Sequence, residues 1–138
     1  MKFIYSLFSV LFLISCSEQV REKENCPNLI CTQEFRTVTV TYKDSAGSPV
    51  IVKDFSAIVR RTGEPTDTKS IGTINFKGNY TVATDNDTKS LLTKGDTIDV
   101  SAVNPKTNQK KTVQFVVSGG KCACHIEKIS GPEEVVFD

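Results

Sequence analysis

The chain has 138 residues, with 17 Lys and Arg against 16 Asp and Glu, five Cys, one His and no Trp. This length accommodates one domain with a tail. The near-neutral charge excludes the overall basic field that holds nucleic acid. The single His excludes any mechanism that needs two imidazoles, and the odd number of Cys leaves one outside any set of intramolecular disulfides.

The N-terminus has the features of a bacterial lipoprotein precursor. Lys2 precedes residues 3–14, a run of 12 mostly apolar residues that is too short to span a membrane but has the length of a secretory signal core. The run ends in Leu13-Ile14-Ser15-Cys16, which resembles a lipobox. This resemblance implies cleavage before Cys16 and acyl chains on Cys16 as the anchor. An ordinary signal peptide with an incidental Cys is the alternative.

Cleavage would leave 123 residues with 16 basic and 16 acidic side chains. By resemblance to Gram-negative lipoproteins, Ser17 after Cys16 favours the outer membrane, on its periplasmic side or at the cell surface. We therefore expect three parts: a signal peptide over residues 1–15, the acylated Cys and a tether over 16–34, and a folded domain over 35–138. The covalent lipid is the only cofactor expected, and it makes the membrane the first partner.

From Phe35 onward the pattern is typical of β-structure. Residues 36–42 alternate polar and apolar side chains, which predicts a strand that buries Val38, Val40 and Tyr42. Residues 50–53 and 55–61 predict one or two further strands, and turn clusters separate the predicted strands at 71–76, 80–84, 98–103, 112–117, 122–129 and 135–137. Seven or eight short strands predict an all-β protein, a single antiparallel sandwich. Further core candidates are Phe55, Ala57, Val59, Ile74, Phe76, Tyr80, Val82, Ile98, Val100, Val113, Phe115, Val117 and Ile126.

Two short motifs carry a resemblance to a known fold family. A strand followed by Asp44, Gly47, Pro49 and Val50 resembles the opening of transthyretin-like and carboxypeptidase-regulatory-like domains, and residues 78–82 (Gly-Asn-Tyr-Thr-Val) resemble a later strand of theirs. The resemblance covers residues 35–117. It implies an Ig-like sandwich of seven strands with a binding or structural role. The ring-opening hydrolase of this fold uses several His, so its activity does not transfer to a chain with one.

Four cysteines remain after Cys16, an even number in an oxidising compartment. A bond between Cys122 and Cys124 would close a strained ring, so we expect a crossed pairing in which Cys26 and Cys31 each bond one of these two. Each crossed bond closes a loop of about 90 residues and contributes roughly 4–5 kcal/mol. The partners stay open, although an antiparallel arrangement would give Cys31–Cys122 and Cys26–Cys124.

A metal site is the rival hypothesis for the same residues. Thiolates of Cys122 and Cys124 with the imidazole of His125, helped by Cys26 and Cys31, could bind zinc or copper. The spacing argues against zinc, which favours Cys-x2-Cys. On a flat strand, His125 would also point away from both neighbouring cysteines and toward the face of Glu127.

Two further short motifs resemble sites of covalent modification. Ser45 and Thr97 lie in Asp-Ser-Ala and Asp-Thr-Ile, which resemble O-glycosylation sites of some exported bacterial proteins.

No motif in the sequence indicates catalysis. The sequence contains no phosphate-binding loop, nucleophile elbow or metalloprotease helix. We therefore expect a lipid-anchored envelope protein that is no enzyme and acts as a binding or accessory module for a protein or glycan. The alternative is a small periplasmic metal-binding protein.

Overall fold

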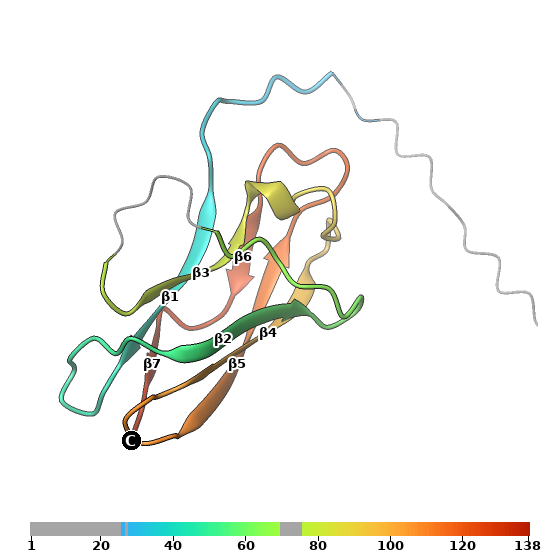
Figure 1. Ribbon diagram of the computed structural model, residues 1–138. Coiled ribbons are helices and arrows are strands. Elements are labelled where there is room, and N and C mark those ends of the chain that lie inside the picture. The colour runs from blue at the N-terminus through green and yellow to red at the C-terminus, as the bar shows by residue number, and fades with distance from the viewer. Residues whose placement is uncertain (1–25, 27, 70–75) are drawn as a thin grey trace, which may run out of the picture.

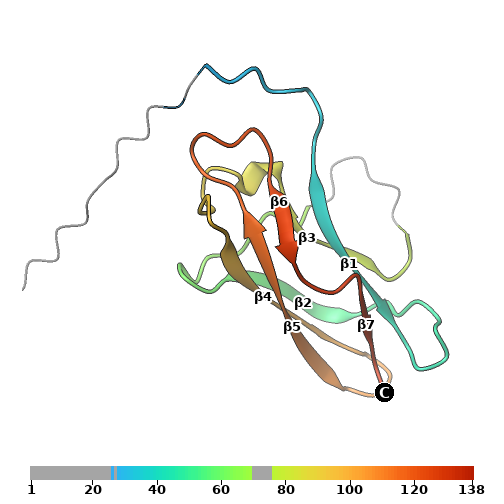
Figure 2. The ribbon, with the colours of Figure 1, turned by 180° about the vertical axis from the view of Figure 1, so that it is seen from behind.

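A computed structural model of the protein describes residues 26, 28–69 and 76–138. These residues form two facing sheets, with strand orders β3-β1-β7 and β2-β4-β5-β6 (Figures 1 and 2). The expected all-β sandwich is confirmed. In this part of the chain no helix is long and apolar enough to cross a membrane. The elements are β1 (Thr37–Lys43), β2 (Lys53–Val59), β3 (Asn79–Thr84), the 3-10 helix η1 (Asp85–Asp87), β4 (Asp96–Val103), β5 (Lys110–Ser118), β6 (Glu127–Ser130) and β7 (Glu134–Val136).

One strand pair departs from the antiparallel expectation. β7 lies parallel to β1, with Thr41–Lys43 opposite Glu134–Val136, whereas the other pairs are antiparallel. A hairpin cannot make a parallel pair. The chain instead leaves the four-stranded sheet after β6 and crosses to the edge of the other sheet. The first and last strands, β1 and β7, are therefore neighbours in the three-stranded sheet.

Gly131 makes this crossing possible. Its φ is 135°, and a Cβ there would lie 2.3 Å from the ring of Phe115. A side chain at this position would thus be both strained and in collision with the core.

The core lies between the two sheets and follows the alternation in the sequence. Successive side chains of a strand point to opposite faces, so every second residue of β1, β4 and β5 turns inward. Phe55, Tyr80 and Val113 are partly buried against it. The expected core residues that are buried are Val38, Val40, Tyr42, Ala57, Val59, Val82, Ile98, Val100, Phe115, Val117 and Ile126.

Three expectations about this layout need correction. Phe76 is wrong as a core residue: it precedes a turn and is 66% exposed. The strand predicted at 122–129 starts only at Glu127, because the residues before it form a disulfide-bonded loop. No strand forms over residues 50–52 either, and β2 begins at Lys53. Apart from Phe76, the predicted strand at 71–76 lies outside the described residues, and so does its core candidate Ile74.

Tyr42 is the centre of an aromatic cluster in the core. Its ring centroid lies 5.6 Å from that of Phe137, 5.7 Å from Tyr80 and 6.3 Å from Phe55. Its hydroxyl is buried and has no hydrogen-bond partner among the described residues. Burial, helped by the neighbouring Tyr80, raises the pKa of Tyr42 to about 12. The ring therefore stabilises the core, whereas the hydroxyl does not.

This asymmetry predicts the behaviour of Tyr42→Phe. At pH 7 we expect the free energy of unfolding to stay the same or rise by up to about 1 kcal/mol, because a buried unsatisfied group is removed. From pH 10 to about 12 the wild type should lose stability, since the tyrosine ionises in the unfolded chain before it does in the native one. Tyr42→Phe should lack this alkaline loss of stability. Urea titrations at pH 7, 9.5 and 11 measure both effects, and an equal alkaline loss in the two proteins would contradict the argument.

Candidate functional site

Two disulfides attach the N-terminal segment to one end of the sandwich, which we call the stapled end. They join Cys26 to Cys122 and Cys31 to Cys124, with Cα–Cα distances of 5.1 and 5.4 Å. The crossed pairing agrees with the expectation. The antiparallel choice, Cys31–Cys122 with Cys26–Cys124, is wrong. Neither segment is a strand here, and the two run alongside each other in the same direction.

The loop that carries Cys122 and Cys124 is itself braced. The ammonium of Lys89 donates hydrogen bonds to the carbonyls of Lys121 and Ala123, at 2.7 and 2.9 Å. The N–H of Gly120 donates to the carbonyl of Thr88 at 2.7 Å. The disulfides therefore attach the N-terminal segment to a loop that is fixed to the body of the domain.

Asp85, the first residue of η1, organises the polar part of this end. Its carboxylate accepts hydrogen bonds from the backbone N–H of Arg36 and of Ile126, both at 2.8 Å, and lies 2.7 Å from Nδ1 of His125. Burial acts to raise the pKa of Asp85, but the hydrogen bonds from Arg36, His125 and Ile126 outweigh it and hold the pKa below its usual value. One carboxylate thus connects the starts of β1, η1 and β6.

His125 extends this network to the N-terminal segment. Its Nε2 lies 3.0 Å from the hydroxyl of Thr32. With the Nδ1 proton directed at Asp85, Nε2 accepts a hydrogen bond from the Thr32 hydroxyl. The order of hydroxyl, imidazole and carboxylate is that of a catalytic triad, but none of these three residues lines either of the two cavities described below. The partner of His125 is therefore Asp85 and not Glu127. In this conformation the network connects three distant segments, and its hydroxyl is the one exposed member.

Sequence reasoning missed Thr32 and Asp85, but one signal for Thr32 was present. Thr32 follows Cys31 and His125 follows Cys124, so the second disulfide places the two next to each other. Knowledge of the pairing would have predicted this contact. Nothing comparable in the sequence indicated Asp85.

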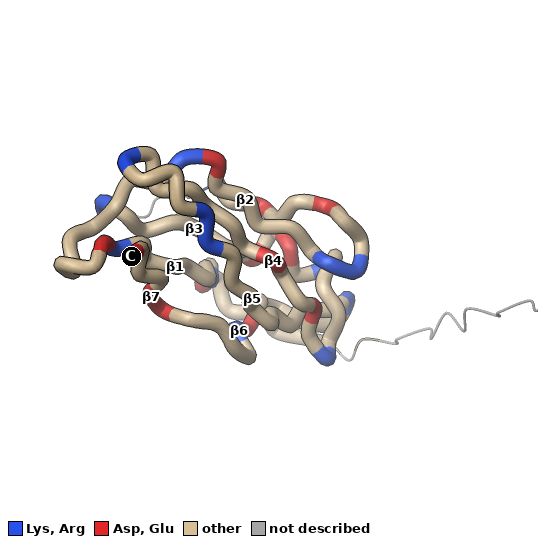
Figure 3. Tube along the Cα trace, turned by 90° about the horizontal axis from the view of Figure 1, so that it is seen from below, with Lys and Arg blue, Asp and Glu red and all other residues tan. Residues whose placement is uncertain are grey.

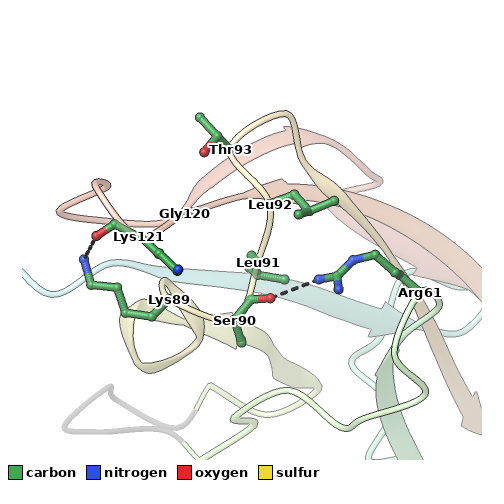
Figure 4. A pocket seen from close by; sticks show the side chains of 8 residues that line it. All are labelled: Arg61, Lys89, Ser90, Leu91, Leu92, Thr93, Gly120 and Lys121. Carbon is green, nitrogen blue, oxygen red and sulfur yellow. Dashed lines mark hydrogen bonds between the residues drawn. The ribbon is translucent and has the colours of Figure 1, made fainter. Parts of the chain in front are cut away.

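A cavity of about 260 Å³ lies beside the disulfide loop, with three basic side chains around it (Figure 4). Two of these cations are already engaged. Arg61 makes a double contact with Asp96, at 2.7 and 2.8 Å, and also reaches the carbonyl of Ser90, while Lys89 holds the loop backbone. The Arg61 hydrogen bond is the main cause of the lowered pKa of Asp96. Because only Lys121 is left without a partner among the described residues, this cavity is a poor anion site.

A second cavity, of about 420 Å³, lies at the opposite end of the molecule, which we call the distal end. The turn after β1 and the turn between β4 and β5 form its walls. Figure 3 views the molecule from this end and shows basic and acidic residues interspersed along the chain. This distribution agrees with the absence of a basic field in the sequence.

The predicted glycosylation, lipidation and metal sites differ in how much of them the structure describes. Ser45 is exposed in the turn after β1, and Thr97 is half-buried in β4, so glycosylation stays a prediction at both. Cys16 lies outside the described residues. The four sulfurs of the metal hypothesis are bonded in pairs, and no group of three or more His, Cys, Asp or Glu within the described ranges could hold a metal ion.

Compared with known proteins, the chain matches no protein-family model, no curated protein and no solved structure, so its own residues carry the functional argument.

The role of Asp85 predicts a loss of stability in Asp85→Asn. The variant keeps the shape but weakens the hydrogen bonds from His125 and two backbone amides, so the free energy of unfolding at pH 7 should fall by about 2 kcal/mol. A carboxylate with a lowered pKa stabilises the fold above its unfolded pKa and loses that effect as the pH falls through the native value. The stability of the wild type should therefore begin to approach that of the variant below about pH 4, and the two should converge only below the lowered native pKa of Asp85. Asp54→Asn, an exposed carboxylate, is the control and should change little.

The disulfides predict the result of a thiol titration. The Cys16→Ala protein, purified without reductant, should contain no free thiol, and peptide mapping should recover the pairs Cys26–Cys122 and Cys31–Cys124. Replacing either pair by alanines should lower the free energy of unfolding by roughly 4 kcal/mol. Four free thiols together with stoichiometric bound zinc or copper would contradict the disulfides and favour a metal site.

Proposed function

We propose that this chain is a lipid-anchored cell-envelope protein that acts as a noncatalytic binding or accessory module. The observation that carries the proposal is the attachment of the tether to the domain. Cys26, ten residues after Cys16, is already bonded to the sandwich. Disulfides persist in the oxidising compartments to which a lipobox directs a chain, so the two features support each other.

The geometry of this attachment gives the module a direction. The tether joins the domain at the stapled end, while the C-terminus and the turn between β4 and β5 lie at the distal end (Figures 1 and 2). Ten extended residues span at most about 35 Å, so the stapled end stays close to the lipid surface. The distal end is the part of the module that faces away from its own anchor.

A domain of the transthyretin-like or carboxypeptidase-regulatory-like type fits this role. The motif residues that suggested it make the turn after β1. The carboxylate of Asp44 accepts hydrogen bonds from the N–H of Ala46 and Ser48, at 3.1 and 2.8 Å, and Gly47 has a φ of 81°. These residues thus have a structural explanation, and the motif adds no catalytic group.

The alternative, a periplasmic metal-binding protein, has less support. Zinc and copper bind to thiolates, and a sulfur in a disulfide is not a thiolate. Such a function would need both disulfides to be reduced and Thr32 to leave Nε2 of His125, whereas the contact of Nδ1 with Asp85 could stay.

The anchor can be tested in a Gram-negative host. The wild type should incorporate labelled palmitate and sediment with the outer membrane. Cys16→Ala should carry no label, because it lacks the thiol that is acylated. Ser17→Asp is the matched control, since it keeps the acylated Cys but should move the protein to the inner membrane. Absence of label from the wild type, or label that persists in Cys16→Ala, would overturn the proposal.

A further inference from the structure

We propose that the cavity at the distal end binds an extended segment of a partner protein that carries an aliphatic side chain next to a carboxylate. This inference rests on the proposed function, because it identifies the ligand class of a binding module whose free end is the distal one. The cavity combines a suitable size with an Asn side-chain donor, lysines without an ion-pair partner among the described residues, and an aliphatic surface.

The size and position of the cavity suit a ligand. Its volume of about 420 Å³ falls within the range of roughly 300–1,000 Å³ that is usual for ligand sites. Val50 and Pro105 form part of its aliphatic wall, and Ile51 at its edge is 59% exposed. Exposed apolar side chains around a hollow are typical of surfaces that contact another molecule.

Asn104 provides the polar contact. Asn104 lines the cavity although it is only 4% exposed, and its side-chain oxygen accepts a hydrogen bond from the N–H of Lys106 at 2.9 Å. Its backbone is also engaged, with Gln109 and Asn108. The side-chain NH₂ has no acceptor among the described residues. The hydroxyl of Tyr42 is the only buried side-chain N or O atom without a partner among the described residues, so this NH₂ group still reaches solvent. A peptide carbonyl in the cavity would accept its hydrogen bond in place of water.

The charges around the cavity favour an acidic ligand. Lys77 and Lys106 line it, and neither has an ion-pair partner in the part of the chain that the structure describes. Two other lysines of this end are neutralised, Lys43 by Glu134 and Lys111 by Asp138. Asp44 also lines the cavity and opposes an anion, but one of its oxygens is committed to the turn. The lining keeps a net positive charge.

The walls favour a polypeptide over an acidic glycan. The lining contains no aromatic ring on which a pyranose could stack, and its apolar part consists of Pro, Val and Ile side chains. Leu or Ile of a partner fits such a surface. The carbonyl next to it would reach Asn104, and an adjacent Glu or Asp would reach the two lysines.

A peptide titration tests the inference. The probe is acetyl-Ala-Leu-Glu-Leu-Ala-amide, added to ¹⁵N-labelled Cys16→Ala protein and followed by amide chemical shifts. We expect shifts concentrated at Val50, Ile51 and Asn104, and about tenfold weaker binding when Glu in the peptide is replaced by Lys. Raising the salt concentration from 50 to 500 mM should weaken binding of the Glu peptide and not that of the Lys peptide.

Variants of the protein make the test specific. Asn104→Asp keeps the acceptor for the Lys106 N–H but removes the donor and adds a negative charge. It should weaken binding of the Glu peptide about tenfold, and the weakening should persist at 500 mM salt, where the effect of the charge is screened. The double substitution of Lys77 and Lys106 by Gln should abolish the preference for the Glu peptide. Lys110→Gln, an exposed lysine outside the cavity lining, is the matched control and should bind as the wild type does.

Three results would overturn the inference: equal affinity for the two peptides, no effect of Asn104→Asp, or binding of a trigalacturonate in place of the peptide. The palmitate labelling of the anchor is independent of this titration. If the peptide does not bind but the anchor behaves as expected, only the proposed ligand is wrong. If the peptide binds but the anchor test fails, only the proposed envelope location is wrong.

Discussion

The covalent attachment of residues 26–31 to the loop before β6 is the constraint on which the stapled end depends. The described residues of this segment, 26 and 28–31, have no regular secondary structure, and their apolar side chains contribute little to the core: Ile30 is 99% exposed and Leu29 is 47% exposed. Hydrophobic burial therefore does not hold it in place. The two disulfides do, across separations of 96 and 93 residues, and they bring Thr32 to His125.

The fold follows largely from the alternation of side chains, and the sequence predicts it well where that alternation is strict. β1 and β4 alternate along their whole length, so both their location and their inward faces could be predicted. The parallel contact of β1 with β7 could not, because short strands carry no signal for their partners. The start of β6 was misplaced because local β-propensity in residues 122–126 is overridden by two disulfides and by the contact of His125 with Asp85.

The candidate sites were less predictable than the fold, since each depends on contacts between distant residues. The crossed class of disulfides followed from geometry and compartment, but the choice of partners depended on chain direction in segments that are not strands. Asn104 looked like an ordinary turn residue. Only its burial and its unused NH₂ group, both properties of the folded chain, distinguish it from the other residues of the same turn.

The positions of the two disulfides also determine how the domain responds to mechanical force. A pull applied between a membrane anchor and a partner at the distal end enters the sandwich through Cys122 and Cys124, and not through the first residue of β1. β1 lies between β3 and β7 in the three-stranded sheet, and tension on its end would peel it from both neighbours. With the disulfides intact, tension bypasses that strand and is transmitted to the braced loop and the central strands. A sandwich attached in this way can remain folded under tension while its free end stays bound.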